Sequence, residues 1–309
     1  MSNIKIICVV GATASGKTSL AVELAKVLNG EIISADSMQV YKGMSVATAA
    51  ATVEEQQGVP HHLIECLDTD EMFSVSEFTA AAGGIIDDII SRGRVPIIAG
   101  GTGLFIDSLV KGIKFSDVGV NEELREELGK KTNEELHAML QKLDSKAADE
   151  IHMNNRKRVI RALELCYGGV GKTGQNEASQ LEESPYDALY IGIGYRDRDK
   201  LYERINRRVD LMLENGLEAE ARQMLPNAGK TARQAIGHKE LKPYFNGEVD
   251  FDTAVESIKR ETRRYAKRQL TWFRRNGSIH WLYADEMPAD DLVNSAIVLA
   301  KDFLETEKI

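Results

Sequence analysis

The amino-acid sequence predicts an α/β protein: a P-loop-containing parallel sheet flanked by helices, with a small all-helical insertion domain. Three observations lead to this prediction. Short apolar runs alternate with helical patterns along most of the chain, which is typical of parallel sheets. The first apolar run leads directly into a glycine-rich phosphate-binding motif. Between the third and fourth predicted strands, the sequence becomes polar and acidic and has a helical pattern.

Composition limits the class of protein. The chain has 309 residues, of which 43% are hydrophobic, and this supports a sizeable core. Its formal net charge is −9, so a nucleic-acid partner would need basic residues gathered in one place. Three widely spaced cysteines, Cys8, Cys66 and Cys166, exclude a disulfide framework and an obvious zinc site and indicate a reducing cytoplasm. No stretch approaches the ~18 uninterrupted apolar residues of a membrane span, and we expect a cytoplasmic monomer.

The phosphate-binding motif follows residues 4–10, an apolar run that predicts a central parallel strand. Residues 11–18 fit G-x-x-x-x-G-K-[ST] at every fixed position, and a helical pattern continues to about Leu28. The glycines let backbone N–H groups converge on phosphate oxygens. Lys17 adds a positive charge, and Thr18 adds a hydroxyl suited to Mg²⁺. We therefore predict a bound di- or triphosphate, held by Gly11, Ala12, Thr13, Ala14, Ser15, Gly16, Lys17 and Thr18.

The other elements follow in order, beginning after Asn29-Gly30, which ends the first helix. Further strands are predicted at residues 31–35, 95–99, 189–193 and 278–283. Helices are predicted at residues 76–91, 198–225 with a break at Gly216, and 253–275. The polar helical segment and a Gly/Ser/Gln-rich loop interrupt this series. We predict a catalytic core of residues 1–116 and 185–309 with C-terminal helices, and a helical insertion domain of residues 117–184.

Two turns fall at predicted strand ends, where parallel sheets bind their ligands. Asp36 follows the second strand, and its position fits a general base, a Mg²⁺ ligand or a helix cap. The third strand ends in residues 100–103, Gly-Gly-Thr-Gly, where many P-loop nucleotidases place an acidic metal ligand. Thr102 can position a polar substrate atom but cannot activate water, which disfavours NTP hydrolysis. The His61-His62 pair has no partner at metal-ligand spacing, and a structural or surface role is favoured.

Two helical segments carry basic side chains. In residues 156–164, Lys157, Arg158 and Arg161 lie on a different face from the apolar positions. Residues 259–275 hold eight basic residues and one acidic residue, a local charge of +7, with Tyr265, Trp272 and Phe273 between them. Basic density with aromatic residues suits a polyanion with stackable bases, although a solvated helix face remains an alternative.

These residues together resemble the bacterial tRNA dimethylallyltransferases, also called tRNA isopentenyltransferases. The phosphate loop is common to many families, whereas the hexapeptide 36–41 and the tract 265–269 are far more specific. The matching segments span nearly the whole chain in order: 11–18, 36–41, 60–63, 100–104, 155–164, 235–237 and 262–272.

The resemblance implies transfer of a dimethylallyl group from dimethylallyl diphosphate to N6 of adenosine 37 in the tRNA anticodon loop, with Mg²⁺ and release of diphosphate. It assigns Asp36 as the general base, Thr102 as the residue that orients the adenosine, and Lys17 as a stabiliser of the leaving group. The helical insertion would clamp the anticodon stem-loop. The implied tRNA contacts are Asp36, Ser37, Met38, Gln39, Thr102, Arg125, Lys157, Arg158, Arg161, Arg268, Gln269 and Trp272.

The sequence departs from the family pattern at several positions. Residues 47–50 read Ala-Thr-Ala-Ala where the family usually has Gly-Thr-Ala-Lys, and Phe105 replaces a common tyrosine. His238 and Lys239 stand where tyrosine and lysine are frequent, and Arg233 is left out of the catalytic set. Three other functions are alternatives: isopentenylation of free AMP, ADP or ATP, phosphorylation of a small molecule, and nucleotide-switched RNA binding without catalysis. The basic tract and the insertion favour tRNA.

Overall fold

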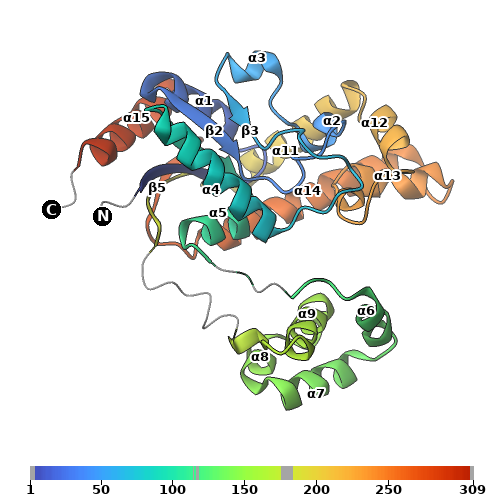
Figure 1. The fold of residues 1–309 in the computed structure, drawn as a ribbon. Coiled ribbons are helices and arrows are strands. Elements are labelled where there is room, and N and C mark those ends of the chain that lie inside the picture. The colour runs from blue at the N-terminus through green and yellow to red at the C-terminus, as the bar shows by residue number, and fades with distance from the viewer. Residues whose placement is uncertain (1–3, 114, 116–117, 175–183, 307–309) are drawn as a thin grey trace. The chain divides into compact units, whose positions relative to one another are not determined.

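The computed structural model describes residues 4–113, 115, 118–174 and 184–306. In these residues, six parallel strands form one sheet in the order β3-β2-β4-β1-β5-β6 (Figure 1). The P-loop strand β1 lies inside the sheet, between β4 and β5. The strands are β1 (Ile4–Gly11), β2 (Gly30–Ser34), β3 (His61–His62), β4 (Val95–Gly100), β5 (Tyr186–Gly194) and β6 (Ile279–Tyr283).

Alternate side chains of β1 enter two different cores, because successive residues of a strand point to opposite faces. Ile6, Cys8 and Val10 pack with α4 and α5, whereas Ile7 and Val9 pack with α1 and α15. All five are fully buried, so the predicted central strand is confirmed. Figure 1 shows helices on both faces of the sheet. The helices are α1 (Lys17–Leu28), α4 (Val75–Ser91), α5 (Gly103–Val110) and α15 (Ala289–Glu305).

A group of helices after β5 forms a third core at the carboxyl ends of the strands. The predicted break at Gly216 is present: this residue has φ +91° and caps the second of two successive helices. A left-handed backbone conformation favours glycine there. The group consists of α11 (Arg198–Glu214), α12 (Leu217–Met224), the 3₁₀ turn η1 (Ala232–Gln234), α13 (His238–Phe245) and α14 (Phe251–Phe273).

The sheet has an edge strand beyond those predicted from the sequence. β3 is only two residues long, His61 and His62, which pair with Ile32 and Ile33 of β2. A strand this short produces no periodicity in the sequence. The short helices α2 (Ser45–Thr48) and α3 (Val53–Gln56) precede it.

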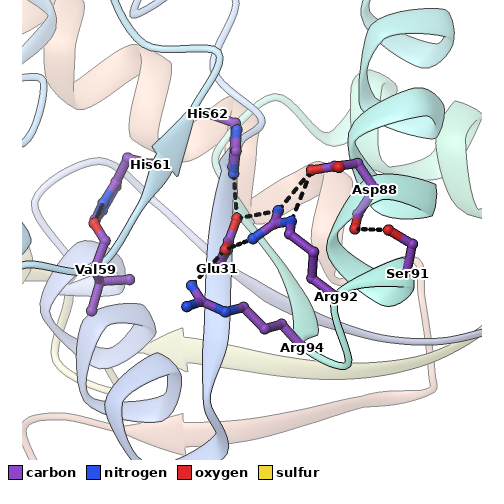
Figure 2. Close-up of polar contacts among 8 residues, drawn as sticks. All are labelled: Glu31, Val59, His61, His62, Asp88, Ser91, Arg92 and Arg94. Atoms are coloured by element: carbon purple, nitrogen blue, oxygen red, sulfur yellow. Dashed lines mark hydrogen bonds and ion pairs between the residues drawn. The ribbon is translucent and has the colours of Figure 1, made fainter.

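The His61-His62 pair has the structural role that the sequence favoured. His62 Nε2 lies 2.7 Å from Glu31 Oε2, and His61 Nδ1 lies 2.8 Å from the Val59 carbonyl oxygen (Figure 2). Arg92 and Arg94 also contact the buried Glu31 carboxylate. Their hydrogen bonds, that of Arg92 above all, lower the pKa of Glu31 to about 2. This cluster sits near the start of β2, whereas Asp36 follows its end.

The chain divides into two compact units, one of Met1–Val110 with Pro185–Ile309 and one of Lys111–Ser184. The second unit has its own apolar core, which includes Leu128, Leu140 and Leu163. Its helices in the described ranges are α6 (Glu122–Gly129), α7 (Asn133–Leu143), α8 (Ser145–Glu150) and α9 (Arg156–Tyr167). Across the residues that the structure describes, no helix combines the length and apolar character needed to cross a membrane.

Candidate active site

The phosphate loop turns sharply between β1 and α1. Gly11 has φ +152°, and a Cβ atom there would lie 2.7 Å from the Ile193 carbonyl oxygen of β5, so a side chain is excluded. Gly16, with φ +101°, caps α1 and directs the first N–H groups of the helix into the loop. Lys17 Nζ donates a hydrogen bond to the Ala12 carbonyl oxygen at 2.7 Å. The loop therefore presents backbone donors and one ammonium group to the same space.

The electrostatic surroundings of Lys17 suit an anion. Burial of the ammonium, followed by the charge of Arg208, lowers the pKa of Lys17 to about 8, and Asp36 opposes this change. Burial also lowers the pKa of Arg208, against the attraction of Asp36 and Glu55. Two cations held close together in a partly dry site favour a ligand that brings several negative charges.

The Asp36 turn and the Thr102 turn contact each other, as their positions at neighbouring strand ends predict. Asp36 Oδ1 accepts a hydrogen bond from the Met38 N–H at 2.9 Å and so holds its own turn. Thr102 Oγ1 accepts from the Ser37 N–H at 3.2 Å. No hydrogen bond to Asp36 Oδ2 occurs within the described ranges of the chain. One carboxylate oxygen thus fixes the turn, and the other can take a proton or a metal ion.

The glycines after β4 allow other segments to approach closely. A Cβ atom on Gly100 would lie 2.2 Å from the Ala35 carbonyl oxygen. On Gly101 it would lie 2.1 Å from Gln269 Nε2 of α14. On Gly103 it would lie 2.2 Å from the Trp272 ring. An acidic side chain at the first two positions would displace β2 or α14, which gives a steric reason for the absence of the nucleotidase carboxylate.

Two residues of α14 that were predicted to contact tRNA make hydrogen bonds to other parts of the chain. Gln269 is buried, donates to the Gly101 carbonyl oxygen at 3.0 Å and accepts from the Thr13 N–H at 2.8 Å. It therefore ties the phosphate loop to the glycine turn. Trp272 Nε1 donates to Asp107 Oδ2 at 2.8 Å. Direct contacts of Gln269 and Trp272 with tRNA remain predictions.

The phosphate loop opens into a cleft of about 760 Å³. Three arginines of α11 line it together with α2 and α3: Arg204, Arg207 and Arg208. Arg204 Nε also donates to the Ala14 carbonyl oxygen at 3.1 Å, which holds the tip of the loop. Lys17 and Thr18 lie at the base of the same cleft. The cleft is thus rich in positive charge, whereas the chain as a whole is acidic.

Two smaller spaces continue from the cleft to the Asp36 turn. An inner pocket of about 200 Å³ is lined by Met38, Ile236, Tyr265 and other residues. A connecting space of about 50 Å³ is lined by Lys17 and Thr18. Asp36, Thr13 and Arg208 line both of these smaller spaces.

Arg208 and Tyr265 are site residues that sequence reasoning missed. Arg208 lines all three spaces, but in the sequence it is one of several arginines on an ordinary amphipathic helix. In the sequence, Tyr265 is an aromatic residue of the basic tract and the first residue of the family-specific segment 265–269, but neither pattern indicates a role in the site. Burial, followed by the Asp36 charge, raises the pKa of Tyr265, so its hydroxyl stays protonated. It lines the inner pocket together with Asp36, Ser37 and Met38 of the Asp36 turn.

The eight basic residues of the tract 259–275, which covers the end of α14 and the two residues after it, fall into two groups. Lys259 pairs with Asp210 at 2.7 Å, and Arg263 donates to Asn206 at 2.6 Å. Arg260 and Arg264 both pair with Glu261, at 3.6 and 2.7 Å. The remaining four have no ion pair among the described residues. Of these, Arg268 lines the inner pocket and lies over the Tyr265 ring. The set available to an external polyanion is Lys267, Arg268, Arg274 and Arg275.

In the second unit, two predicted tRNA contacts pair with one buried carboxylate. Arg125 makes two hydrogen bonds to Glu164, at 2.8 and 3.0 Å. Arg161 Nη1 lies 3.4 Å from the same carboxylate. Lys157 and Arg158 are exposed on α9. The contacts of all four residues with tRNA remain predictions.

Two departures from the family pattern have a structural explanation. Phe105 stacks on Phe78 with ring centroids 4.5 Å apart and lies edge-on to Phe73, so a tyrosine hydroxyl would enter an aromatic core. Arg233 is exposed and donates to the Pro226 carbonyl oxygen at 3.2 Å, while the next residue, Gln234, lines the inner pocket. This placement supports leaving Arg233 out of the catalytic set.

The described residues contain no group of three or more His, Cys, Asp or Glu side chains able to hold a metal ion. The connecting space nevertheless offers oxygen donors of the kind that Mg²⁺ prefers, from Thr18, Asp36 and Gln39. Mg²⁺ usually keeps several waters and binds through one or two protein groups plus substrate phosphates. These residues therefore fit a Mg²⁺ ion that arrives with a diphosphate.

Comparison of the sequence with known protein families shows to which family the chain belongs. The sequence profile of IPP transferase matches residues 39–276, and that of isopentenyl transferase matches residues 4–69. The chain belongs to the IPP transferase family. It is therefore a transferase of prenyl groups, and the predicted family is confirmed.

Relatives and solved structures agree with this assignment. A tRNA dimethylallyltransferase of Acetivibrio thermocellus is 47% identical over 296 residues, covering 93% of this chain and 94% of the relative. The tRNA isopentenylpyrophosphate transferase structure of Bacillus halodurans has a TM-score of 0.74 at 42% identity and covers 97% of both chains. A eukaryotic dimethylallyltransferase acting on tRNA has a TM-score of 0.83 at 29% identity, covering 99% of this chain and 81% of that one. The predicted parallel α/β fold is confirmed.

Proposed function

We propose that the chain transfers a dimethylallyl group from dimethylallyl diphosphate to N6 of adenosine 37 in the anticodon loop of tRNA and releases diphosphate. One observation carries the proposal: a phosphate-binding cleft and a pocket containing Asp36 meet in one connecting space. A donor held by its phosphates and an acceptor beside a base can therefore approach each other from opposite sides. Relatives named tRNA dimethylallyltransferase support the same reaction.

The cleft binds the diphosphate of the donor. Loop N–H groups and Lys17 contact the phosphate oxygens, and Arg208 lies where the cleft meets the connecting space. These donors gain importance as the C–O bond breaks, because negative charge then accumulates on the leaving diphosphate. Thr18, with the diphosphate oxygens, would hold Mg²⁺, which would supply further charge neutralisation.

The inner pocket receives the adenine. Its amine is a weak nucleophile, because the nitrogen lone pair is delocalised into the ring. Asp36 accepts a proton from N6 as N6 bonds to the allylic carbon and the diphosphate departs with the electron pair of the C–O bond. Thr102 holds the Asp36 turn through the Ser37 N–H, and Tyr265, which lines the pocket, helps to position the adenosine. The base leaves the anticodon stack to reach this pocket, at a cost of a few kcal/mol.

The rest of the tRNA lies along basic surfaces. On α14, Arg268 stands at the mouth of the inner pocket and Lys267 is exposed beside it. In the helical insertion, residues 117–184, Lys157 and Arg158 are exposed, and this domain clamps the anticodon stem-loop. A tRNA substrate implies a cytoplasmic enzyme. All three spaces are built by a single chain, so the proposed active form is a monomer.

A transfer assay tests the proposal. The purified chain is incubated with unmodified tRNA, Mg²⁺ and dimethylallyl diphosphate, the RNA is digested, and the nucleosides are weighed by mass spectrometry. We expect one prenylated adenosine per tRNA, and none when guanosine replaces adenosine 37. Parallel reactions contain AMP, ADP or ATP instead of tRNA. Prenylation of these nucleotides with no product on tRNA would contradict the proposal and indicate an adenylate isopentenyltransferase. Phosphorylation of a small metabolite by ATP, without prenylation, would indicate a kinase.

A further inference from the structure

The short helix α2 forms the wall between two spaces of the site. Ser45, Val46 and Ala49 line the large cleft. Ala47 and Thr48 line the inner pocket. A shift of this helix therefore changes the shape of both spaces at once.

The carbonyl groups at the end of α2 hold two side chains of the site. The Thr48 carbonyl oxygen accepts hydrogen bonds from Arg208 Nη2 and from Gln39 Nε2, both at 3.3 Å. The Ala49 carbonyl oxygen accepts a second bond from Gln39 Nε2, also at 3.3 Å. Arg208 and Gln39 line the connecting space together with Asp36. The position of α2 thus affects two groups beside the reacting atoms.

The start of α2 has no side-chain cap from its own residue Met44. Instead, Glu220 of α12 reaches it from a distant part of the sequence. Glu220 Oε2 accepts from the Val46 N–H at 2.8 Å, and Oε1 accepts from the Ala47 N–H at 2.9 Å. A carboxylate at a helix start satisfies free N–H groups and interacts favourably with the helix dipole.

His238 of α13 holds this carboxylate in place. Its Nε2 lies 2.8 Å from Glu220 Oε1, and the carboxylate is an acceptor, so Nε2 carries the ring proton. The two side chains are 1% and 10% exposed, so water replaces neither partner easily. The other ring nitrogen, Nδ1, is buried and has no hydrogen-bond partner in the described structure.

We propose that Glu220 and His238 are positioning residues for the transfer reaction, a role that rests on the proposed function. Neither lines any of the three spaces. They act through α2: the carboxylate fixes the start of the helix, and the carbonyls at its end orient Arg208 and Gln39. A displacement of about 1 Å at reacting groups can lower a rate about 100-fold, so an anchor of this kind affects catalysis.

Glu220→Gln tests the anchor without a change of side-chain volume. The amide presents an NH₂ group to the Val46 or Ala47 N–H, so at least one bond to α2 is lost. We expect kcat to fall about 10- to 100-fold and the KM for dimethylallyl diphosphate to rise. The KM for tRNA should change less, because most of the proposed tRNA contacts lie outside the inner pocket. Hydrogen exchange should become faster in peptides covering residues 44–50. The control is Glu218→Gln, because Glu218 lies on the same helix but pairs, within the described part of the chain, with Arg222 of that helix and not with α2.

Two substitutions at His238 separate positioning from packing. His238→Phe keeps a ring but removes the donor, and we expect it to lower kcat and accelerate exchange at residues 44–50. His238→Gln restores an N–H donor near the Nε2 position, and we expect it to recover most of the activity. If Glu220→Gln does not fold, as judged by thermal melting, the two His238 variants decide the question. Equal activity of the Phe and Gln variants would contradict the proposal.

A ligand-binding measurement keeps this inference distinct from the proposed function. The affinity for inorganic pyrophosphate is measured by calorimetry for the wild type, Glu220→Gln and Glu218→Gln. Weaker binding in Glu220→Gln alone, with faster exchange at residues 44–50, supports the anchor even if the wild type does not prenylate tRNA. Wild-type exchange at these residues in Glu220→Gln would overturn the anchor, whatever the transfer assay gives.

Discussion

The helices α9 and α14 lie in different compact units of the chain, and both place basic side chains beside an apolar face. On α9, Arg161 shares the buried carboxylate of Glu164 with Arg125. On α14, Gln269 connects the phosphate loop to the glycine turn, and Arg268 lines the inner pocket. The same kind of sequence pattern therefore stabilises a small domain in one case and lines the proposed active site in the other.

The difference between the two helices comes from what is buried beside them. Glu164 is 2% exposed, and a carboxylate at such depth must be paired. Arg125 and Arg161 meet this need, so part of the basic face of α9 is used internally. α14 buries the neutral amide of Gln269 instead, and among the described residues no buried acid pairs with Arg268. Arg268 therefore remains available to the pocket, whereas Arg125 and Arg161 are paired inside their own unit.

The largest effect is expected from Asp36, which lies in the same compact unit as α14. Its replacement tests whether the chemistry takes place in that unit. For Asp36→Ala we predict that kcat falls on the order of 10²–10⁴-fold, because no other group takes the N6 proton. The Kd for tRNA should change little, since the basic surfaces are intact. Single-turnover kinetics and a filter-binding assay measure the two quantities. Near-normal turnover would remove Asp36 from the role of base.

The next largest effect is expected from Arg125, which pairs with the buried Glu164 carboxylate of α9. We predict that Arg125→Met lowers the free energy of unfolding of the insertion unit by about 2–3 kcal/mol, because it removes two hydrogen bonds to a buried carboxylate. Denaturant unfolding of the whole chain, followed by exchange in residues 118–174, measures this. The control is Lys157→Met, which removes an exposed charge in the same unit. Equal unfolding curves for the two variants would show that the Glu164 pairs contribute no stability.

A smaller effect is expected from the basic residues in and just after α14 that have no ion pair among the described residues. We predict that Arg268→Ala and Arg274→Ala each weaken tRNA binding and reduce the slope of log K against log salt by about 1. Their stability should match the wild type, because neither has an ion pair in the described residues. The matched control is Arg264→Ala, whose side chain pairs with Glu261 on the same helix. An unchanged salt slope in both variants would place the tRNA path elsewhere.

Most local elements of the fold could be predicted from the sequence, because their signals are local. The apolar run of β1, the phosphate loop and the break at Gly216 each depend on a few neighbouring residues. The two-residue strand β3 and the helices α5 and α15 were not predicted. β3 forms by pairing with the edge of β2, which is a contact between distant residues that the local sequence does not show. The sequence analysis assigned no helix to the residues of α5 or α15.

The site could be predicted only in part, for a related reason. Asp36 and Thr102 could be predicted because each follows the end of a predicted strand, where parallel sheets bind their ligands. This prediction does not depend on how the helices pack. Arg208 and Glu220 lie on helices whose sequence looks ordinary, and only tertiary packing brings them to α2. In the sequence, the glycines after β4 are notable because they replace the acidic metal ligand of P-loop nucleotidases. The structure gives the reason for them: Gln269 and Trp272 pack against Gly101 and Gly103 and leave no room for side chains.

The smallest effect is expected from the two exposed basic residues of α9, Lys157 and Arg158. Lys157 and Arg158 are exposed, unlike Arg125, so their removal should leave stability unchanged. If the insertion clamps the anticodon stem-loop, each neutralised residue should weaken tRNA binding only a few-fold, because a single screened phosphate contact contributes about 1 kcal/mol or less. The double variant Lys157→Ala with Arg158→Ala should show the product of the two losses in a filter-binding assay, with kcat at saturating tRNA unchanged. A loss of kcat at saturation would contradict the comparison, since it would give the exposed face of α9 a part in the chemistry that we assign to α14 and its neighbours.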